Sequence, residues 1–222
     1  MAVDGIATER GGRDPHAVCV YCGSSDGVPR RYLDLAAETG TAIAARGWSL
    51  VSGGGRRSMM GAVAIAARQG GARTLGVIPR SMVEREWADH DSDELLVTET
   101  MRERKAVMEV HADAFLALPG GLGTCEELFE VWSAGGLGLH GKPVVLLDPD
   151  GHWTGLLDWV SGLVEAGFAS RAPLERLVVA RTVDEALDAC APTPASAPAG
   201  APGSPPPAPA SADGTSVSRS QA

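Results

Sequence analysis

Short apolar runs alternate regularly with helix-forming segments along most of this 222-residue chain. The run Val144–Leu147 contains no polar residue, which is typical of a strand that a parallel sheet buries on both faces. The segment Arg30–Arg46 instead carries apolar residues at helical spacing, including Leu33, Ala36 and Ile43. Strands joined by helices pair in parallel through right-handed crossovers, so helices cover both faces of the sheet. The alternation therefore predicts an α/β fold.

The same pattern locates the individual elements. The predicted strands are Ala17–Cys22, Trp48–Val51, Thr74–Ile78, Glu94–Thr98, Ala114–Leu118, Val144–Leu147 and Leu177–Val179. The predicted helices are Arg30–Arg46, Met59–Arg68, Met101–His111, Thr124–Ser133, Leu156–Ala166 and Val183–Ala189. Together they predict a single Rossmann-like, doubly wound parallel sheet with helices on both faces. In such sheets ligands bind beyond the carboxyl ends of the strands.

The two ends of the chain differ in composition from its middle. Residues 1–15 are polar and charged, and residues 192–222 are rich in Pro, Ala, Ser and Gly. Segments of this kind cannot bury enough apolar surface to offset the entropy cost of ordering them. We therefore predict a disordered N-terminal segment at 1–15, one Rossmann-like domain at 16–191 and a disordered tail at 192–222. We assign no function to the tail.

Charge and cysteine content narrow the possible partners. The chain has 19 Lys and Arg against 28 Asp and Glu, a net charge of −9 that disfavours nucleic-acid backbones and anionic membranes. We find neither a signal-peptide pattern nor an apolar run long enough to span a bilayer. Cys19 and Cys22 form a C-x-x-C without a second pair, and the histidines are scattered, so we predict no metal site. A cytoplasmic protein is expected.

The glycine-rich turn Pro119–Thr124 directly follows the predicted strand Ala114–Leu118. Three glycines allow a tight turn and close approach of a ligand, and Thr124 can cap the helix that follows. A helix N-terminus offers free N–H groups and a positive dipole end, which suit a phosphate. Glu126 and Glu127 are expected in the first helical turn, where the dipole favours their ionised form. The alternative is a tight connection whose acids only stabilise the helix.

Two further segments are candidates for ligand contacts. Gly53–Gly55 follows a predicted strand and precedes a predicted helix, but Ser58 stands where a dinucleotide fingerprint has its third glycine. This cluster therefore either approaches a nucleotide or is a plain packing turn. Arg104 and Lys105 are adjacent, so they project from different sides of their helix, and the stretch can equally be a solvated basic surface. Lys105 and Lys142 are the only lysines of the chain.

These segments resemble the LONELY GUY (LOG) family, the cytokinin riboside 5′-monophosphate phosphoribohydrolases, many of which have been mislabelled as lysine decarboxylases. Pro119 to Glu127 matches the family signature P-G-G-x-G-T-x-x-E, and Met101 to Lys105 matches M-x-x-R-K. Weaker blocks follow the family's order: Val20 to Ser25, Val51 to Gly55 with Met60-Gly61, and Gly76 to Pro79 with Arg85-Glu86. The similarity runs from about Ala17 to Cys190.

The resemblance implies a Rossmann-like homodimer with active sites at the interface. It implies hydrolysis of the N-glycosidic bond of an N6-modified AMP, giving the free base and ribose 5-phosphate without a cofactor. By position in the family motifs, Glu127 and Arg104 are the implied catalytic pair. The implied substrate contacts are Ser24, Gly54, Gly55, Glu86, Lys105, Gly120, Gly121, Leu122, Gly123, Thr124, Cys125 and Glu126.

Five positions depart from the family pattern. Arg102 replaces a frequent His or Trp, Ser52 a usual aromatic residue, Ser58 a glycine, and Arg56-Arg57 smaller residues. These changes leave the implied catalytic pair intact and bear on the base that is accepted, either a modified or an unmodified AMP. Two other functions are open: a lysine decarboxylase dependent on pyridoxal phosphate, which needs a Schiff-base lysine, and a non-catalytic nucleotide carrier on the same fold.

Overall fold

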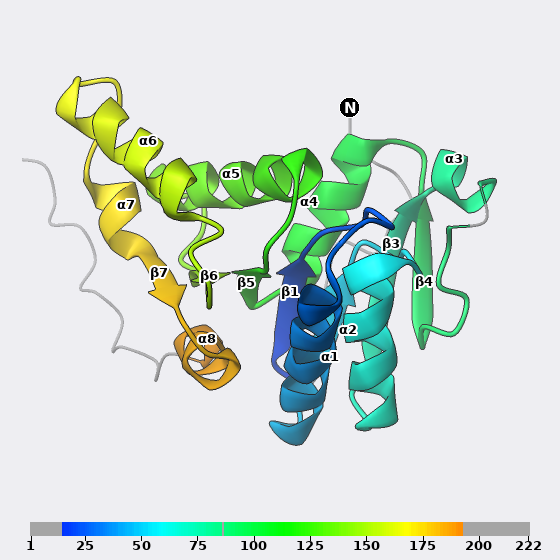
Figure 1. Ribbon diagram of the computed structural model, residues 1–222. Helices are drawn as coiled ribbons and strands as arrows, with labels where there is room; N and C mark the ends of the chain where they lie inside the picture. The colour runs from blue at the N-terminus through cyan, green and yellow to red at the C-terminus, as the bar shows by residue number, and fades with distance from the viewer. Residues whose placement is uncertain (1–14, 86, 193–222) are drawn as a thin grey trace, which may run out of the picture. The chain divides into compact units, whose positions relative to one another are not determined.

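Seven parallel strands form one sheet in the order β4-β3-β2-β1-β5-β6-β7 (Figure 1). The computed structural model describes residues 15–85 and 87–192. The strands are β1 Ala17–Tyr21, β2 Ser49–Ser52, β3 Thr74–Pro79, β4 Glu94–Thr98, β5 Ala114–Ala117, β6 Val144–Leu147 and β7 Leu177–Ala180. The predicted disordered ends, except residues 15 and 192, and the candidate residue Glu86 lie outside the described residues.

Helices cover both faces of the sheet, which confirms the predicted fold class. One layer contains α1 (Arg30–Ala45), α2 (Ser58–Gln69) and α8 (Val183–Cys190), and the other contains α4 (Met101–His111), α5 (Leu122–Gly136), α6 (Thr154–Glu165) and α7 (Ala172–Arg176). A single-turn helix, α3 (Arg80–Val83), follows β3. The sequence pattern did not predict α3 and α7, because helices this short have too few residues to show a helical period.

The central strand β1 supplies both hydrophobic cores. All of its residues are buried, and successive side chains point to opposite faces of the sheet. Val18 and Val20 pack into the core beneath α1 and α2, whereas Ala17, Cys19 and Tyr21 pack into the core beneath α4 and α5. Neither face of β1 meets water, which explains why the strand is apolar at every position.

The sheet grows in two directions from the pair β1–β5. The chain passes from β1 outward to β4, returns to place β5 beside β1, and then continues outward to β7. Two backbone hydrogen bonds extend this pairing past the strand ends, from Leu118 N–H to the Tyr21 carbonyl (2.9 Å) and from Gly23 N–H to the Pro119 carbonyl (3.2 Å). The following connections then diverge to opposite faces, which opens a crevice at this point.

Helices α1 and α2 lie side by side on their face of the sheet (Figure 1). Their close approach depends on Gly40, because a Cβ atom at this position would lie 2.2 Å from the Val63 carbonyl oxygen and 2.9 Å from the Ala67 nitrogen. Backbone atoms cannot move aside as a flexible side chain can. A methyl group at residue 40 must therefore separate the two helices.

We expect Gly40→Ala to lower the free energy of unfolding by about 1–3 kcal/mol, the usual cost of forcing extra volume into a packed core. The matched control is Gly162→Ala in α6, where an added Cβ meets no atom within 4 Å. This control should stabilise the protein by about 0.5–1 kcal/mol, because alanine loses less conformational entropy in a helix. Urea unfolding of the three proteins measures both effects. Equal stability of Gly40→Ala and the parent would contradict the close-packing assignment.

Candidate active site

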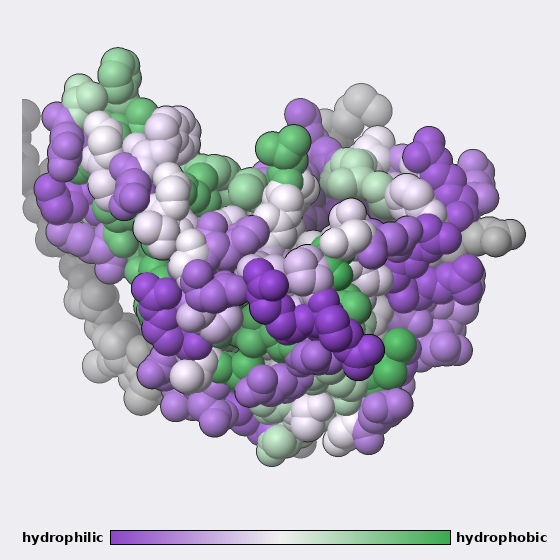
Figure 2. Space-filling view, in the orientation of Figure 1, coloured by the Kyte–Doolittle hydropathy of each residue, from purple (hydrophilic) through white to green (hydrophobic). Residues whose placement is uncertain are grey.

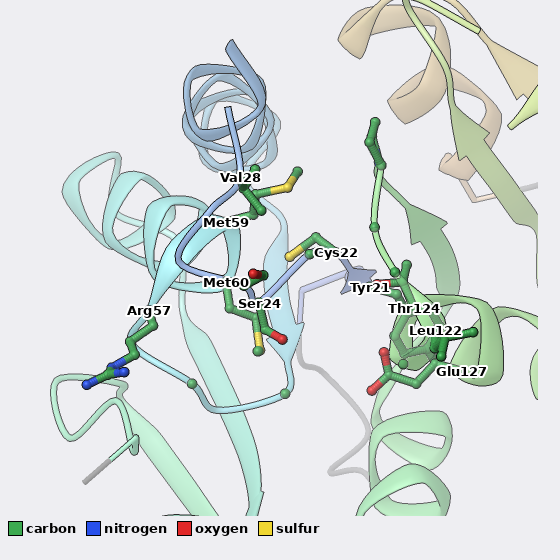
Figure 3. Close-up of a pocket in the computed structure, with 18 of the residues that line it drawn as sticks. Tyr21, Cys22, Ser24, Val28, Arg57, Met59, Met60, Leu122, Thr124 and Glu127 are labelled. Carbon is green, nitrogen blue, oxygen red and sulfur yellow. The ribbon is translucent and has the colours of Figure 1, made fainter. Parts of the chain in front are cut away.

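A cavity of about 800 Å³ occupies the crevice between the ends of β1 and β5 (Figure 3). The segment after β1 lines one part of it, and the turn after β5 with the start of α5 lines another. The segment after β2, α3 and α4 also contribute side chains or backbone. The predicted site residues that line the cavity are Ser24, Gly55, Arg104, Gly120, Gly121, Leu122, Gly123, Thr124, Glu126 and Glu127.

Arg104 and Glu127 form a buried ion pair at the wall of this cavity. The distance from Arg104 Nη1 to Glu127 Oε1 is 2.7 Å, and the two side chains are only 7% and 11% exposed. Arg104 Nε also donates to the Val77 carbonyl oxygen at 3.0 Å, which fixes the plane of the guanidinium. The arginine is thus held from two sides, and it orients the carboxylate toward the cavity.

The positions of these two side chains follow from the elements that carry them. Thr100 and Glu103 form a capping box that fixes the first turn of α4, and Arg104 follows directly. Gly53 leaves the space for the guanidinium, since a Cβ there would lie 1.9 Å from Arg104 Nη2. The glycine cluster after β2 therefore makes room for the ion pair, because Gly53 has no side chain to displace the guanidinium.

The start of α5 differs from the prediction. The helix begins at Leu122 with Gly121 as its N-cap, not at Thr124, and no side chain caps it. Thr124 lies inside the first turn, buried against Gly120, whose missing Cβ would meet Thr124 Oγ1 at 2.1 Å. A Cβ on Gly121 or Gly123 would meet no atom within 4 Å, so the backbone of this turn is open to the cavity. The start of α5 is therefore fixed by packing of Thr124 against the Gly120 backbone and not by a side-chain cap.

This shift moves Glu126 and Glu127 into the second turn, away from the helix N-terminus at which they were predicted. Burial raises the pKa of the Glu127 carboxyl above its ordinary value, and the Arg104 guanidinium offsets part of that rise. The carboxylate therefore has little water around it, and Arg104 is its main stabilising cation.

Lys105 was an implied substrate contact, but its side chain does not line the cavity. Its Nζ contacts Glu126 Oε1 and lies 2.6 Å from Glu130 Oε2. Burial lowers the pKa of Lys105, but hydrogen bonds to both carboxylates outweigh this effect and raise it. The lysine therefore ties α4 to α5. Cys125 and Gly54, two other implied substrate contacts, do not line the cavity either. Gly54 instead packs against Val77 and Ile78, with a φ of +69°.

Several lining residues were not predicted as site residues. Many of them are apolar, including Val20, Val28, Met59, Met60, Ile78, Met82, Trp87 and Met101. Val28, Met59 and Met60 lie across the cavity from Glu127, and Arg57 lies at its outer edge (Figure 3). His152 also lines the cavity, from the segment after β6. The sequence indicated only that His152 lies beyond the carboxyl end of the strand now seen as β6. The strand order, which places β6 next to β5, brings His152 to the cavity.

Ser58, which replaces a family glycine, has a left-handed backbone with a φ of +52°. This conformation costs a residue with a side chain about 1–2 kcal/mol, whereas glycine adopts it freely. Ser58 Oγ donates a hydrogen bond to the Ser25 carbonyl oxygen at 2.7 Å, which compensates part of this cost. The serine consequently fastens the cavity-lining segment after β1 to the start of α2.

The described residues contain neither a metal-binding cluster nor a membrane-spanning helix. Among residues 15–85 and 87–192, no cluster of three or more His, Cys, Asp or Glu side chains is arranged to hold a metal ion. Within the same ranges, none of the helices combines the length and apolar character that crossing a membrane requires.

Comparison with known proteins places these features in a family. Residues 60–190 match the family model described as "Possible lysine decarboxylase". The chain is 56% identical to the cytokinin riboside 5′-monophosphate phosphoribohydrolase of Mycobacterium tuberculosis, over 79% of this chain and 94% of that protein. It is 43% identical to cytokinin riboside 5′-monophosphate phosphoribohydrolase LOG3 of Arabidopsis thaliana, over 76% of this chain and 78% of that protein.

A solved structure shares the fold. The molybdenum cofactor carrier protein of Chlamydomonas reinhardtii superposes with a TM-score of 0.61 at 25% identity, covering 80% of this chain and 96% of that chain. Family match, sequence identity and fold agree, and the chain belongs to the LONELY GUY (LOG) family of phosphoribohydrolases.

Proposed function

We propose that this protein hydrolyses the N-glycosidic bond of a cytokinin riboside 5′-monophosphate, with unmodified AMP as the alternative substrate. The products are the free base and ribose 5-phosphate. The observation that carries the proposal is the buried Arg104–Glu127 pair, which lines one cavity together with the open first turn of α5. The enzymes of Mycobacterium tuberculosis and Arabidopsis thaliana named above support the same reaction class.

The proposed chemistry uses the two charges of this pair. As the bond between C1′ and N9 breaks, positive charge develops on the ribose and negative charge on the departing purine. The Glu127 carboxylate stabilises the cationic sugar and orients the attacking water, and its poor solvation strengthens both interactions. Arg104 holds the carboxylate in place and stabilises the departing base electrostatically.

The 5′-phosphate would bind at the first turn of α5. Backbone N–H groups at a helix N-terminus and the positive end of its dipole attract anions. Gly121 and Gly123 leave this backbone uncovered, which supports the assignment. Ser24 and Gly55 are proposed to contact the nucleotide from the other cavity walls, and Glu86 remains a proposed contact outside the described residues.

The two alternative functions fit the site less well. A decarboxylase that uses pyridoxal phosphate needs a lysine in its cofactor pocket, but neither Lys105 nor Lys142 lines the cavity. Lys105 Nζ is paired with Glu126 and Glu130, and Lys142 Nζ donates to the Glu109 carbonyl oxygen. A carrier function would resemble that of the Chlamydomonas protein, yet a carrier has no need of a desolvated carboxylate beside the ligand.

A homodimer with its active sites at the interface is part of the proposal. Large apolar side chains are exposed at the start of α5 and after α6, where Leu122 is 91% and Phe168 is 84% exposed. Figure 2 shows apolar surface in both places. A second copy of the chain covering this surface would remove these side chains from water, and Leu122 also lines the cavity. A cytoplasmic location stays a prediction from the sequence.

The first test is release of free base from matched pairs of nucleotide and nucleoside. Without the 5′-phosphate, kcat/KM should fall at least about a hundredfold, since two or more charge-assisted hydrogen bonds are lost. Chromatography of a panel of modified and unmodified adenosine monophosphates, with their nucleosides, measures this ratio. Equal turnover of AMP and adenosine would exclude the phosphate site, and the absence of base release from every monophosphate would exclude the proposed function.

The second test replaces the proposed catalytic carboxylate. Glu127→Gln keeps the size of the side chain but removes the charge that stabilises the cationic sugar, so single-turnover base release should slow about a hundredfold. Affinity for AMP, measured by calorimetry, should change much less, because the ribose of the bound substrate is neutral. Glu130→Gln on the same helix is the matched control and should keep the parental rate. Wild-type turnover in Glu127→Gln would remove this residue from the mechanism.

The third test concerns the dimer. Phe168→Asp places a charge on the exposed apolar surface and should convert the protein to monomers with reduced base release. Ile65→Asp is the control, because Ile65 is an exposed apolar residue on α2, in the opposite helical layer. Sedimentation equilibrium gives the oligomeric state of each protein. Full activity in a monomeric variant would show that the site is complete within one chain.

A further inference from the structure

The imidazole of His152 is held against the glycine-rich turn by its neighbours. Its ring makes an edge contact with the buried Trp153, at a centroid distance of 4.8 Å and an interplanar angle of 90°. A second edge contact, at 6.2 Å, is with Tyr32 of α1, whose hydroxyl donates to Asp150 Oδ2 at 3.0 Å. The ring therefore has a fixed place at the cavity wall although His152 is solvent-exposed.

From this place the imidazole reaches both backbone polar groups of Gly120. Its Nε2 lies 3.1 Å from the Gly120 nitrogen and 2.9 Å from the Gly120 oxygen. One ring nitrogen either donates or accepts, so Nε2 accepts from the N–H in one tautomer and donates to the carbonyl oxygen in the other. In both tautomers, Nε2 occupies the point toward which the Gly120 N–H is directed.

This contact limits how the turn can bind an anion. A phosphate oxygen that accepted from the Gly120 N–H would occupy the position of His152 Nε2. On its other side, Gly120 packs against Thr124, where even a Cβ atom has no room. Gly120 is thus enclosed by two side chains, whereas the backbone at Gly121 and Gly123 is open.

We propose that His152 is a positioning residue of the phosphate site. It holds the Gly120 peptide, so that the ligand's phosphate is bound by the first-turn amides of α5 and not by the Gly120 N–H. The inference deepens the proposed function, on which it rests for the identity of the ligand as a phosphate monoester. It also changes the expected role of Gly120 from a substrate contact to a fixed support for the turn.

The test compares two variants of His152. His152→Phe keeps a flat ring against Trp153 and Tyr32 but removes Nε2, whereas His152→Gln carries a side-chain amide that reaches the same point. Calorimetry with ribose 5-phosphate and AMP should show affinity about three- to tenfold weaker in the Phe variant, the worth of one hydrogen bond. The Gln variant should bind within about twofold of the parent. If the Phe variant proves unstable, the Gln variant still allows phosphate affinity to be compared with the parent in a folded protein.

Kinetics and NMR separate positioning from a general structural role. In His152→Phe, KM for the nucleotide should rise while kcat stays within about twofold, because Arg104 and Glu127 lie on α4 and α5. In the parent, ribose 5-phosphate should shift the amide resonances of Gly121 to Thr124, while the His152 Nε2 resonance stays in place.

Each outcome decides a separate point. Unchanged or tighter phosphate binding in His152→Phe would overturn the positioning role, even if the parent releases base as proposed. Normal phosphate binding by the parent without any base release would instead overturn the proposed function and leave the role of His152 standing. A parent protein that binds neither ribose 5-phosphate nor AMP would overturn both.

Discussion

The pairing of β1 with β5 is the constraint on which the site depends. Four residue pairs set its register, from Val18 with Ala114 to Tyr21 with Ala117. This register brings the segments after two strands together although almost a hundred residues separate them in the chain. Because the sheet reverses its direction of growth here, the two connections leave toward opposite faces. The cavity results from that divergence. The glycine-rich turn after β5 and the segment after β1 both line it for this reason.

Within this frame, the Arg104–Glu127 pair is the most demanding local feature. Two charges with little solvent contact are stable only when geometry and further hydrogen bonds compensate the lost hydration. Here Val77 supplies the extra acceptor and Gly53 supplies the space. The pair joins α4 to α5, and through Val77 it also reaches β3. This buried pair thereby fixes the relative positions of three elements.

Much of the fold could be predicted because the central strands, such as β1, β5 and β6, are short, apolar and buried on both faces. The family motifs likewise indicated most of the lining around α5. The start of α5 could not be placed, because a glycine and backbone packing begin this helix where a capping side chain was expected. His152 was missed because its position depends on β6 lying next to β5, and strand order is absent from local sequence patterns.

The methionines of the cavity bear on which bases this protein can accept. Four of the six methionines in the chain line this one space: Met59, Met60, Met82 and Met101. Unbranched thioether side chains adopt many shapes at small cost, whereas the glycines and the ion pair tolerate almost no displacement. The cavity lining therefore combines adaptable methionine side chains with rigid glycines and a rigid ion pair. If the protein acts as proposed, nucleotides with differently shaped bases would be accommodated by rearranging methionine rotamers, without disturbing Arg104 and Glu127.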